Sequence, residues 1–269
     1  MAGQDVVSQP TNHPPGIDGN ANDDIWKTAP VTTTHDTVAN IDIDIQSAHN
    51  DQTIFFLVRF PDSSETRQHK YLVWDDTLKV YRTGKKREDS FVFKWNMEPR
   101  PVDLALYGDD PYKADIWYWK ANRTDPIGFA DDKHHIYGQS KLKKSRIVVS
   151  HTGKQFYLTR LSDSGKSAYS SQTYEKFSGP EVPRYKNRQP TGSRADVRAK
   201  GTWDNGYWTI EFSRPLQTGH PDDVQFDPDR SYSFGVSRYE IAGKPANKGL
   251  EQALYESGDI SELFTLKWK

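Results

Sequence analysis

The chain has 269 residues, of which 34% are hydrophobic and 13% are aromatic, and its mean hydropathy is -0.87. Lys and Arg number 36 against 37 Asp and Glu, and this balance argues against the broad basic surface of a nucleic-acid-binding protein. The chain contains no Cys, which excludes disulfides, thiolate metal sites and haem attached through a C-x-x-C-H motif.

The N-terminal segment is polar. Residues 1–16 include Pro10, Pro14 and Pro15 and are predicted to form a flexible N-terminal arm. The first ten residues show no basic stretch followed by an apolar one, so no signal peptide is predicted in them. No run of about 18 apolar residues occurs, so no membrane insertion is predicted.

From residue 17 onward, short apolar runs alternate with spacers rich in turn-forming residues, and residues 41–45 (I-D-I-D-I) alternate most cleanly with a period of two. No segment keeps a helical period for three turns, although residues 250–255 could form a short helix. The prediction is a mainly β fold, an antiparallel β-sandwich of immunoglobulin or jelly-roll type with long loops and at most one or two short helices. The predicted strands cover residues 39–46, 53–60, 70–74, 90–95, 115–120, 146–150, 155–160, 207–213, 231–239 and 263–268, with a further one near Trp203.

The spacer at about 162–200 is rich in Ser, Gly, Pro and charged residues and is too long for a hairpin turn. Spacers of this length are usually functional or disordered. Because no internal repeat or linker divides the rest of the chain, residues 17–269 are predicted to form a single β-sandwich domain with this long excursion.

Trp117 and Trp119 alternate with Tyr118, so both indoles should lie on one face of a strand. They could pack into the core, the interpretation we favour, or form an outward platform for a sugar or a partner protein. The following D-D-K-H-H segment is predicted to be a loop at the rim of the sandwich. Its carboxylates and imidazoles could bind a metal, but neighbouring His134 and His135 would point to opposite faces of a strand, so one of them at most could serve. The other interpretation is a pair of exposed histidines.

Catalytic signatures are missing from the sequence. It has no G-x-S-x-G elbow, phosphate-binding loop, H-E-x-x-H motif or G-x-G-x-x-G motif. Its many carboxylates suggest no particular acid and base pair. The chain is therefore predicted not to be an enzyme by itself.

Several separated motifs, taken in order, resemble the haem-binding domain of the ethylbenzene dehydrogenase gamma-subunit family. They are D-G-x-x-x-D-D-x-W at residues 18–26, the Glu88–Asp89 pair, residues 114–133, residues 203–219, and a closing strand at 263–268. The same family supplies gamma subunits to related molybdenum enzymes, such as dimethylsulfide dehydrogenase, selenate reductase, chlorate reductase and nitrite oxidoreductase.

The resemblance implies a β-sandwich like that of family 9 carbohydrate-binding modules and DOMON domains, with one non-covalent haem b between the sheets. It implies a cytochrome b-type electron-transfer or accessory subunit, periplasmic or otherwise exported, with molybdenum and iron–sulfur oxidoreductase subunits or another redox protein as partners. The alternative is a haem-free binding or assembly module of the same fold, with a partner protein or a carbohydrate as ligand.

In the family the haem iron lies between a Met and a Lys. The place of that Met falls on Tyr107 here, and Met97 lies further upstream. The place of the Lys, counted back from the closing strand, falls on Tyr255, and the nearest upstream lysine is Lys248. Tyrosinate binds ferric haem, whereas a ligating lysine must be neutral and therefore buried. The alternative roles are a core side chain for Met97 and a solvated loop cation for Lys248.

Overall fold

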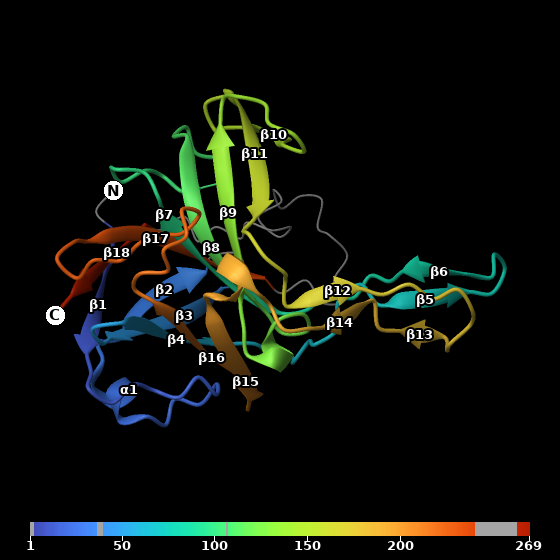
Figure 1. Cartoon of the computed structure of the whole chain (residues 1–269), viewed down its shortest axis with the longest axis horizontal. Helices are drawn as coiled ribbons and strands as arrows, with labels where there is room; N and C mark the ends of the chain where they lie inside the picture. Colours follow the sequence, from blue (N-terminus) through green and yellow to red (C-terminus); the bar gives the residue numbers. More distant parts are fainter. Residues whose placement is uncertain (1–2, 37–39, 106, 240–262) are drawn as a thin grey trace.

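The computed structural model describes residues 3–36, 40–105, 107–239 and 263–269, with the side chains of 238 and 239 excepted. It confirms the predicted mainly β fold (Figure 1). The helical elements are α1 (Asp24–Thr28), η1 (Asp125–Ile127) and η2 (Gly192–Ala195). The strands are β1 (Asp5–Pro10), β2 (Thr32–Asp36), β3 (Ile41–His49), β4 (Thr53–Pro61), β5 (Leu72–Asp75), β6 (Val80–Thr83), β7 (Ser90–Asn96), β8 (Tyr112–Lys120), β9 (Asp131–Gly138), β10 (Arg146–Val149), β11 (Gln155–Ser162), β12 (Tyr169–Ser171), β13 (Glu181–Val182), β14 (Tyr185–Asn187), β15 (Arg198–Asp204), β16 (Tyr207–Pro215), β17 (Tyr232–Tyr239) and β18 (Phe264–Trp268).

The main sheet runs in the order β10-β11-β9-β8-β7-β17-β18-β1-β3-β4-β16-β15, and β2 pairs with β3. Its two halves face each other across one core, because buried side chains from β3, β4 and β16 join those from β7, β8 and β17 in a single cluster. The result is a sandwich whose layers are joined through β17, β18 and β1. No helix among the described residues is long and apolar enough to cross a membrane.

Aromatic rings fill this core. Trp95 lies with its ring centroid 4.5 Å from that of Phe234 and 5.1 Å from that of Trp117, and Trp119 lies 4.9 Å from Trp208. Trp117 and Trp119 are fully buried, which confirms that their indoles point inward and rules them out as an outward platform. A fully buried large apolar side chain contributes about 1.5–3 kcal/mol, so rings compensate for the small number of aliphatic residues.

The prediction of a flexible arm over residues 1–16 is wrong for residues 5–10. These residues form β1, which pairs in parallel with β18 on one side and β3 on the other. Val6 and Ser8 are fully buried, and the Ser8 hydroxyl accepts a hydrogen bond from Ser47 at 3.0 Å. Two neighbouring strands satisfy the backbone of β1, so a polar segment with a single buried Val forms a strand.

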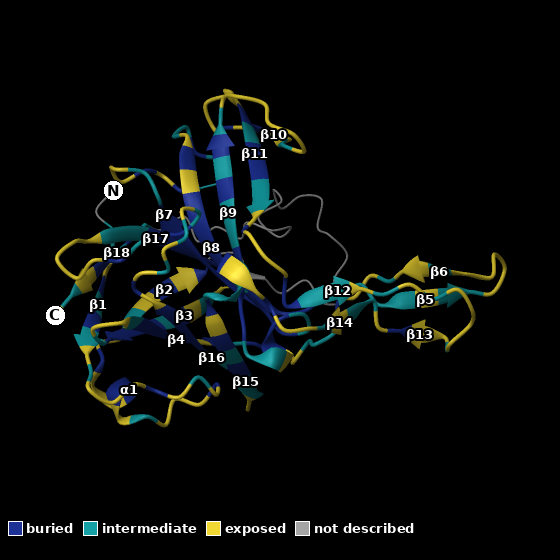
Figure 2. Ribbon diagram, viewed as in Figure 1, coloured by how far each residue is buried: buried dark blue, intermediate teal, exposed yellow. Residues whose placement is uncertain are grey.

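The predicted rim loop at residues 131–135 is also wrong, because these residues lie in β9, between β8 and β11. The excursion at 162–200 contains β12, β13, β14 and η2, and β13 pairs with β5 in a small sheet that also contains β6. This small sheet projects from the sandwich (Figure 1), and much of it is exposed (Figure 2). The helix predicted at 250–255 lies outside the described residues.

Candidate functional site

Strands β8 and β9 present two faces of different chemistry. Asp115, Trp117 and Trp119 of β8 point into the sandwich core, and alternate residues point to the outer face of the sheet. In β9, the Asp132 position pairs with Trp117 and the His134 position pairs with Asp115. Candidate ligands therefore lie on both sides of the same pair of strands.

The outer face carries a second apolar cluster, which we call the outer cluster. Tyr107 and Leu263 both pack against it, although 156 residues separate them in the sequence (263 minus 107). Met97 packs against the core cluster instead, so Met97 and Tyr107 do not share a face. The outer cluster consists of Val92, Val102, Leu104, Tyr112, Ala114, Ile116, Tyr137, Val148, Phe156 and Leu158.

His135 lies on the outer face, in line with Tyr137. Burial, together with the charges of Lys94, Arg160 and Lys133, lowers the pKa of His135 well below its usual value, so the imidazole is neutral at pH 7. Lys94 itself is buried, and its Nζ donates a hydrogen bond to the Leu104 carbonyl at 2.5 Å. The face thus combines apolar side chains, a neutral imidazole and several cations.

The core side of the same strands holds a buried acidic group made of Asp115, Asp132 and Asp223. Each offers an oxygen within 4.8 Å of the others. Arg214, which is fully buried, contacts Asp115 at 2.5 Å between Nη1 and Oδ2, and the Val224 amide donates to the same oxygen at 2.9 Å. Burial and the carboxylates of Asp115 and Asp223 raise the pKa of Asp132 well above its usual value.

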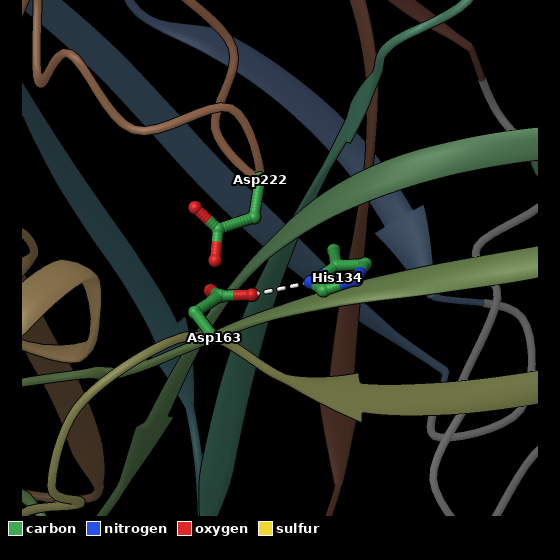
Figure 3. Close-up of side chains that lie close together, drawn as sticks. All are labelled: His134, Asp163 and Asp222. Atoms are coloured by element: carbon green, nitrogen blue, oxygen red, sulfur yellow. Dashed lines mark hydrogen bonds and ion pairs between the residues drawn. The ribbon is translucent and has the colours of Figure 1, made fainter.

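A second group consists of His134, Asp163 and Asp222, whose side chains lie close together (Figure 3). His134 and Asp222 are partly exposed. His134 Nδ1 is 2.5 Å from Asp163 Oδ1. Burial raises the pKa of Asp163 to about 7, and the hydrogen bond with Asp163 raises the pKa of His134 above its usual value. Of the two predicted metal ligands, only His134 lies beside carboxylates that could complete a site.

Several motif residues turn out to hold the fold together. Asp125 accepts hydrogen bonds from Trp119 Nε1 at 2.9 Å and from the Gly201 amide at 2.6 Å. Glu88 accepts from the amides of Asn122 and Arg123 at 2.7 and 2.9 Å. The dense polar segment after β8 therefore forms hydrogen bonds that connect strands distant in the sequence.

The acidic residues that complete both groups come from parts of the chain that no pattern linked to the histidines. Asp222 and Asp223 belong to the loop after β16, and Asp163 follows β11. Only the folded sheet brings them beside β9. Of the remaining predicted haem ligands, Lys248 and Tyr255 lie outside the described residues.

Comparison with known protein families identifies the family of this chain. The sequence model of the family described as ethylbenzene dehydrogenase matches residues 20–250, which is most of the chain. The chain belongs to the ethylbenzene dehydrogenase family. This ethylbenzene dehydrogenase family member also has the mainly β fold that the resemblance implied.

Solved structures similar to this ethylbenzene dehydrogenase family member include a family 9 carbohydrate-binding module from Caldicellulosiruptor kristjanssonii in complex with glucose. It has 11% identity and a TM-score of 0.45, over 99% of this chain and 96% of that chain. A proposed carbohydrate-binding protein from Bacteroides uniformis has 10% identity and a TM-score of 0.45, over the whole of both chains. No curated protein matches the sequence.

Proposed function

We propose that this ethylbenzene dehydrogenase family member is a haem-binding electron-transfer or accessory subunit that holds haem b non-covalently at the outer cluster. This place differs from the expected one between the sheets, because buried aromatic rings fill the core there. The observation that carries the proposal is the meeting of Tyr107 and Leu263 on that cluster. The resemblance places one axial position at Tyr107 and the other shortly before β18, which Leu263 precedes directly. Two segments far apart in sequence thus reach one apolar face.

The described residues fit a haem at this face in chemical type. The outer cluster offers an apolar surface for the porphyrin, and the charges of Lys94 and Lys133 make its surroundings positive. Tyr107 and the neutral imidazole of His135 are the donors that this face contributes, and both are known haem ligand types. When bound, haem would supply one-electron chemistry, and the protein would bind it and exclude water.

The same proposal includes the partners and the location. An exported accessory subunit of this kind would exchange electrons with molybdenum and iron–sulfur subunits and would not itself be the enzyme. The family match supports this assignment. Met97 is the weaker ligand candidate because it packs on the core side of the sheet.

The test is a haemin titration of the purified full chain, followed by visible spectra in the oxidised and dithionite-reduced states. We expect one haem per chain and a Soret band that changes in Tyr107→Phe or His135→Gln. Tyr207→Phe, at a 37% exposed position outside the outer cluster, is the matched control and should behave as wild type. Failure of the wild-type protein to bind haemin stoichiometrically would overturn the proposal.

A haem-free assembly module is the second candidate, and the projecting small sheet favours it. Leu78, in the β5–β6 turn, is 55% exposed, and Phe177 is 58% exposed. Exposed apolar side chains on a projecting element are typical of protein contacts. We expect the double variant Leu78→Ser with Phe177→Ser to co-purify more weakly with co-expressed molybdenum and iron–sulfur subunits. Leu142 is also exposed but lies on another loop, so Leu142→Ser should leave co-purification unchanged. Equal recovery of both variants would exclude this contact.

A further inference from the structure

The acidic group of Asp115, Asp132 and Asp223 contains more buried oxygens than the described residues satisfy. Asp132 is fully buried, and neither of its carboxylate oxygens has a hydrogen-bond partner among the described residues. Asp115 Oδ1 and Asp223 Oδ2 are likewise buried and accept no hydrogen bond from the part of the chain that the structure describes. A buried carboxylate without a hydrogen-bond donor is strongly destabilising, so it requires a ligand or a proton.

The charge of the group points to a cation. Three carboxylates face the guanidinium of Arg214, and the imidazole of His220, which is bonded to Asp196, lies 3.9 Å from Asp223 Oδ2. The group therefore keeps a net negative charge when all three carboxylates are ionised. The Arg214 guanidinium already contacts Asp115 and the Val224 carbonyl, and it lies 5.2 Å from the ring centroids of Trp117 and Phe226. A divalent cation would neutralise the group and satisfy the open oxygens together.

The neighbouring group is a weaker candidate for a cation. His134 Nδ1 is already bonded to Asp163, and the two oxygens of Asp222 accept hydrogen bonds from Ser193 Oγ at 3.1 Å and from the Ser164 amide at 3.3 Å. One oxygen of this group, Asp163 Oδ2, is open, whereas both oxygens of Asp132 lack a partner among the described residues. Most of the open oxygens therefore lie in the buried group.

We propose that Asp115, Asp132 and Asp223 bind a calcium ion that fastens β8 and β9 to the loop after β16. Hard carboxylate oxygens without nitrogen or sulfur donors suit calcium, whose bond lengths of about 2.3–2.6 Å allow oxygens on opposite sides of the ion to lie nearly 5 Å apart. The ion takes its remaining ligands from water. This site lies on the opposite side of the sheet from the outer cluster, so it is independent of haem.

The test uses the full chain, stripped with EGTA and then dialysed, at pH 7.5. Thermal unfolding is followed by circular dichroism with calcium, magnesium, manganese or zinc added alone. We expect calcium to raise Tm by about 5 °C at a hundredfold excess over Kd. Asp132→Asn should lose this shift and be at least as stable as wild type in EGTA, because it removes one of the repelling charges. Asp229→Asn, on an exposed loop, should keep the wild-type shift.

Terbium provides a second measurement that does not depend on a variant. Terbium occupies calcium sites, and Trp117, which pairs with the Asp132 position, should sensitise its luminescence. Calcium should displace the signal at one ion per chain. Three results would overturn the proposal: no response of the wild type to calcium, a response to zinc alone, or a full calcium shift in Asp132→Asn.

Discussion

Lys120 and Asp131 form an ion pair in which Nζ lies 2.5 Å from Oδ2 and both side chains are 1% exposed. Lys133 lies 3.5 Å from the same carboxylate, and Arg194 also bonds to it. Burial opposes ionisation of Asp131, but these cations hold its pKa well below the usual value, while burial lowers the pKa of Lys120 to about 8. One carboxylate thus interacts with three cations.

Removing this carboxylate should be costly. We expect Asp131→Ala to lower the free energy of unfolding by about 3–5 kcal/mol, because buried Lys120 loses its counter-charge. Urea unfolding measures the change. Asp110→Ala, which removes a half-exposed partner of Arg100, is the control and should change stability by less than about 1 kcal/mol. Similar stability of the two variants would mean that Lys120 is compensated in another way.

A substitution of Gly201 on β15 would test the tight contact between this strand and Trp119. A Cβ atom at this position would lie 2.5 Å from Trp119 Cζ2 and 3.3 Å from Ile210 Cγ1. We expect Gly201→Ala to lower the free energy of unfolding by about 1–3 kcal/mol, since a buried indole cannot move aside. Gly138→Ala at the end of β9 has nothing within 4 Å of its Cβ and should be tolerated. An unchanged unfolding midpoint for Gly201→Ala would show that β15 can shift.

Glu211 fastens the segment around α1 to the sandwich. Its carboxylate accepts hydrogen bonds from Trp26 Nε1 at 2.7 Å and from the amides of Gly19 and Asp18 at 2.9 and 3.0 Å. In Glu211→Ala these donors lose their acceptor, so we expect a loss of about 1–3 kcal/mol and faster hydrogen exchange in residues 17–30. Glu181→Ala on the projecting small sheet is the control. Uniformly faster exchange over the whole chain would contradict a local role.

The buried His135 should make stability depend on pH. Its pKa is lowered in the folded protein, so only the unfolded chain takes up the proton as the pH falls below about 6.5. Stability contributed by this neutral imidazole is therefore complete above that pH and decreases below it. Between pH 7.5 and 5.5 the loss is about 1.4 kcal/mol from this group.

His135→Gln should remove this part of the pH dependence in urea unfolding measured at pH 5.5, 6.5 and 7.5. Exposed His151→Gln should retain it. Other histidines, such as His134 and His220, have raised pKa values and contribute with the opposite sign, so the comparison between variants isolates His135. Identical slopes for wild type and His135→Gln would contradict a neutral buried imidazole.

Apolar runs predicted most of the sandwich, because a strand such as β4 or β7 contains enough aromatic and aliphatic residues to be recognised in the sequence. Strand β9 was missed for the opposite reason. Its Asp131 and His134 are polar, and they are accommodated because the partners Arg194 and Asp163 come from elsewhere in the chain. Buried polar strands depend on tertiary contacts that a local pattern does not contain.

The candidate site shows the same limit. Met97 and Tyr107 were alternatives for one ligand position, yet they pack on opposite sides of the sheet, which strand alternation alone could not reveal across the intervening loop. The acidic group joins Asp115, Asp132 and Asp223 from three separate parts of the chain. The ligand assignments of Met97, Tyr107, Lys248 and Tyr255 stay predictions.

The position of β1 between β18 and β3 has a consequence for folding. The Asp5 position pairs with Thr265, so this contact closes a loop of about 260 residues, one of the most expensive contacts in entropy that the chain makes. During synthesis, β1 emerges about 260 residues before its partner β18, so the edge of β1 that pairs with β18 stays unpaired in the meantime. Exposed edges of this kind attract other strands. The slowest step of folding should therefore be the meeting of the first strand with the last.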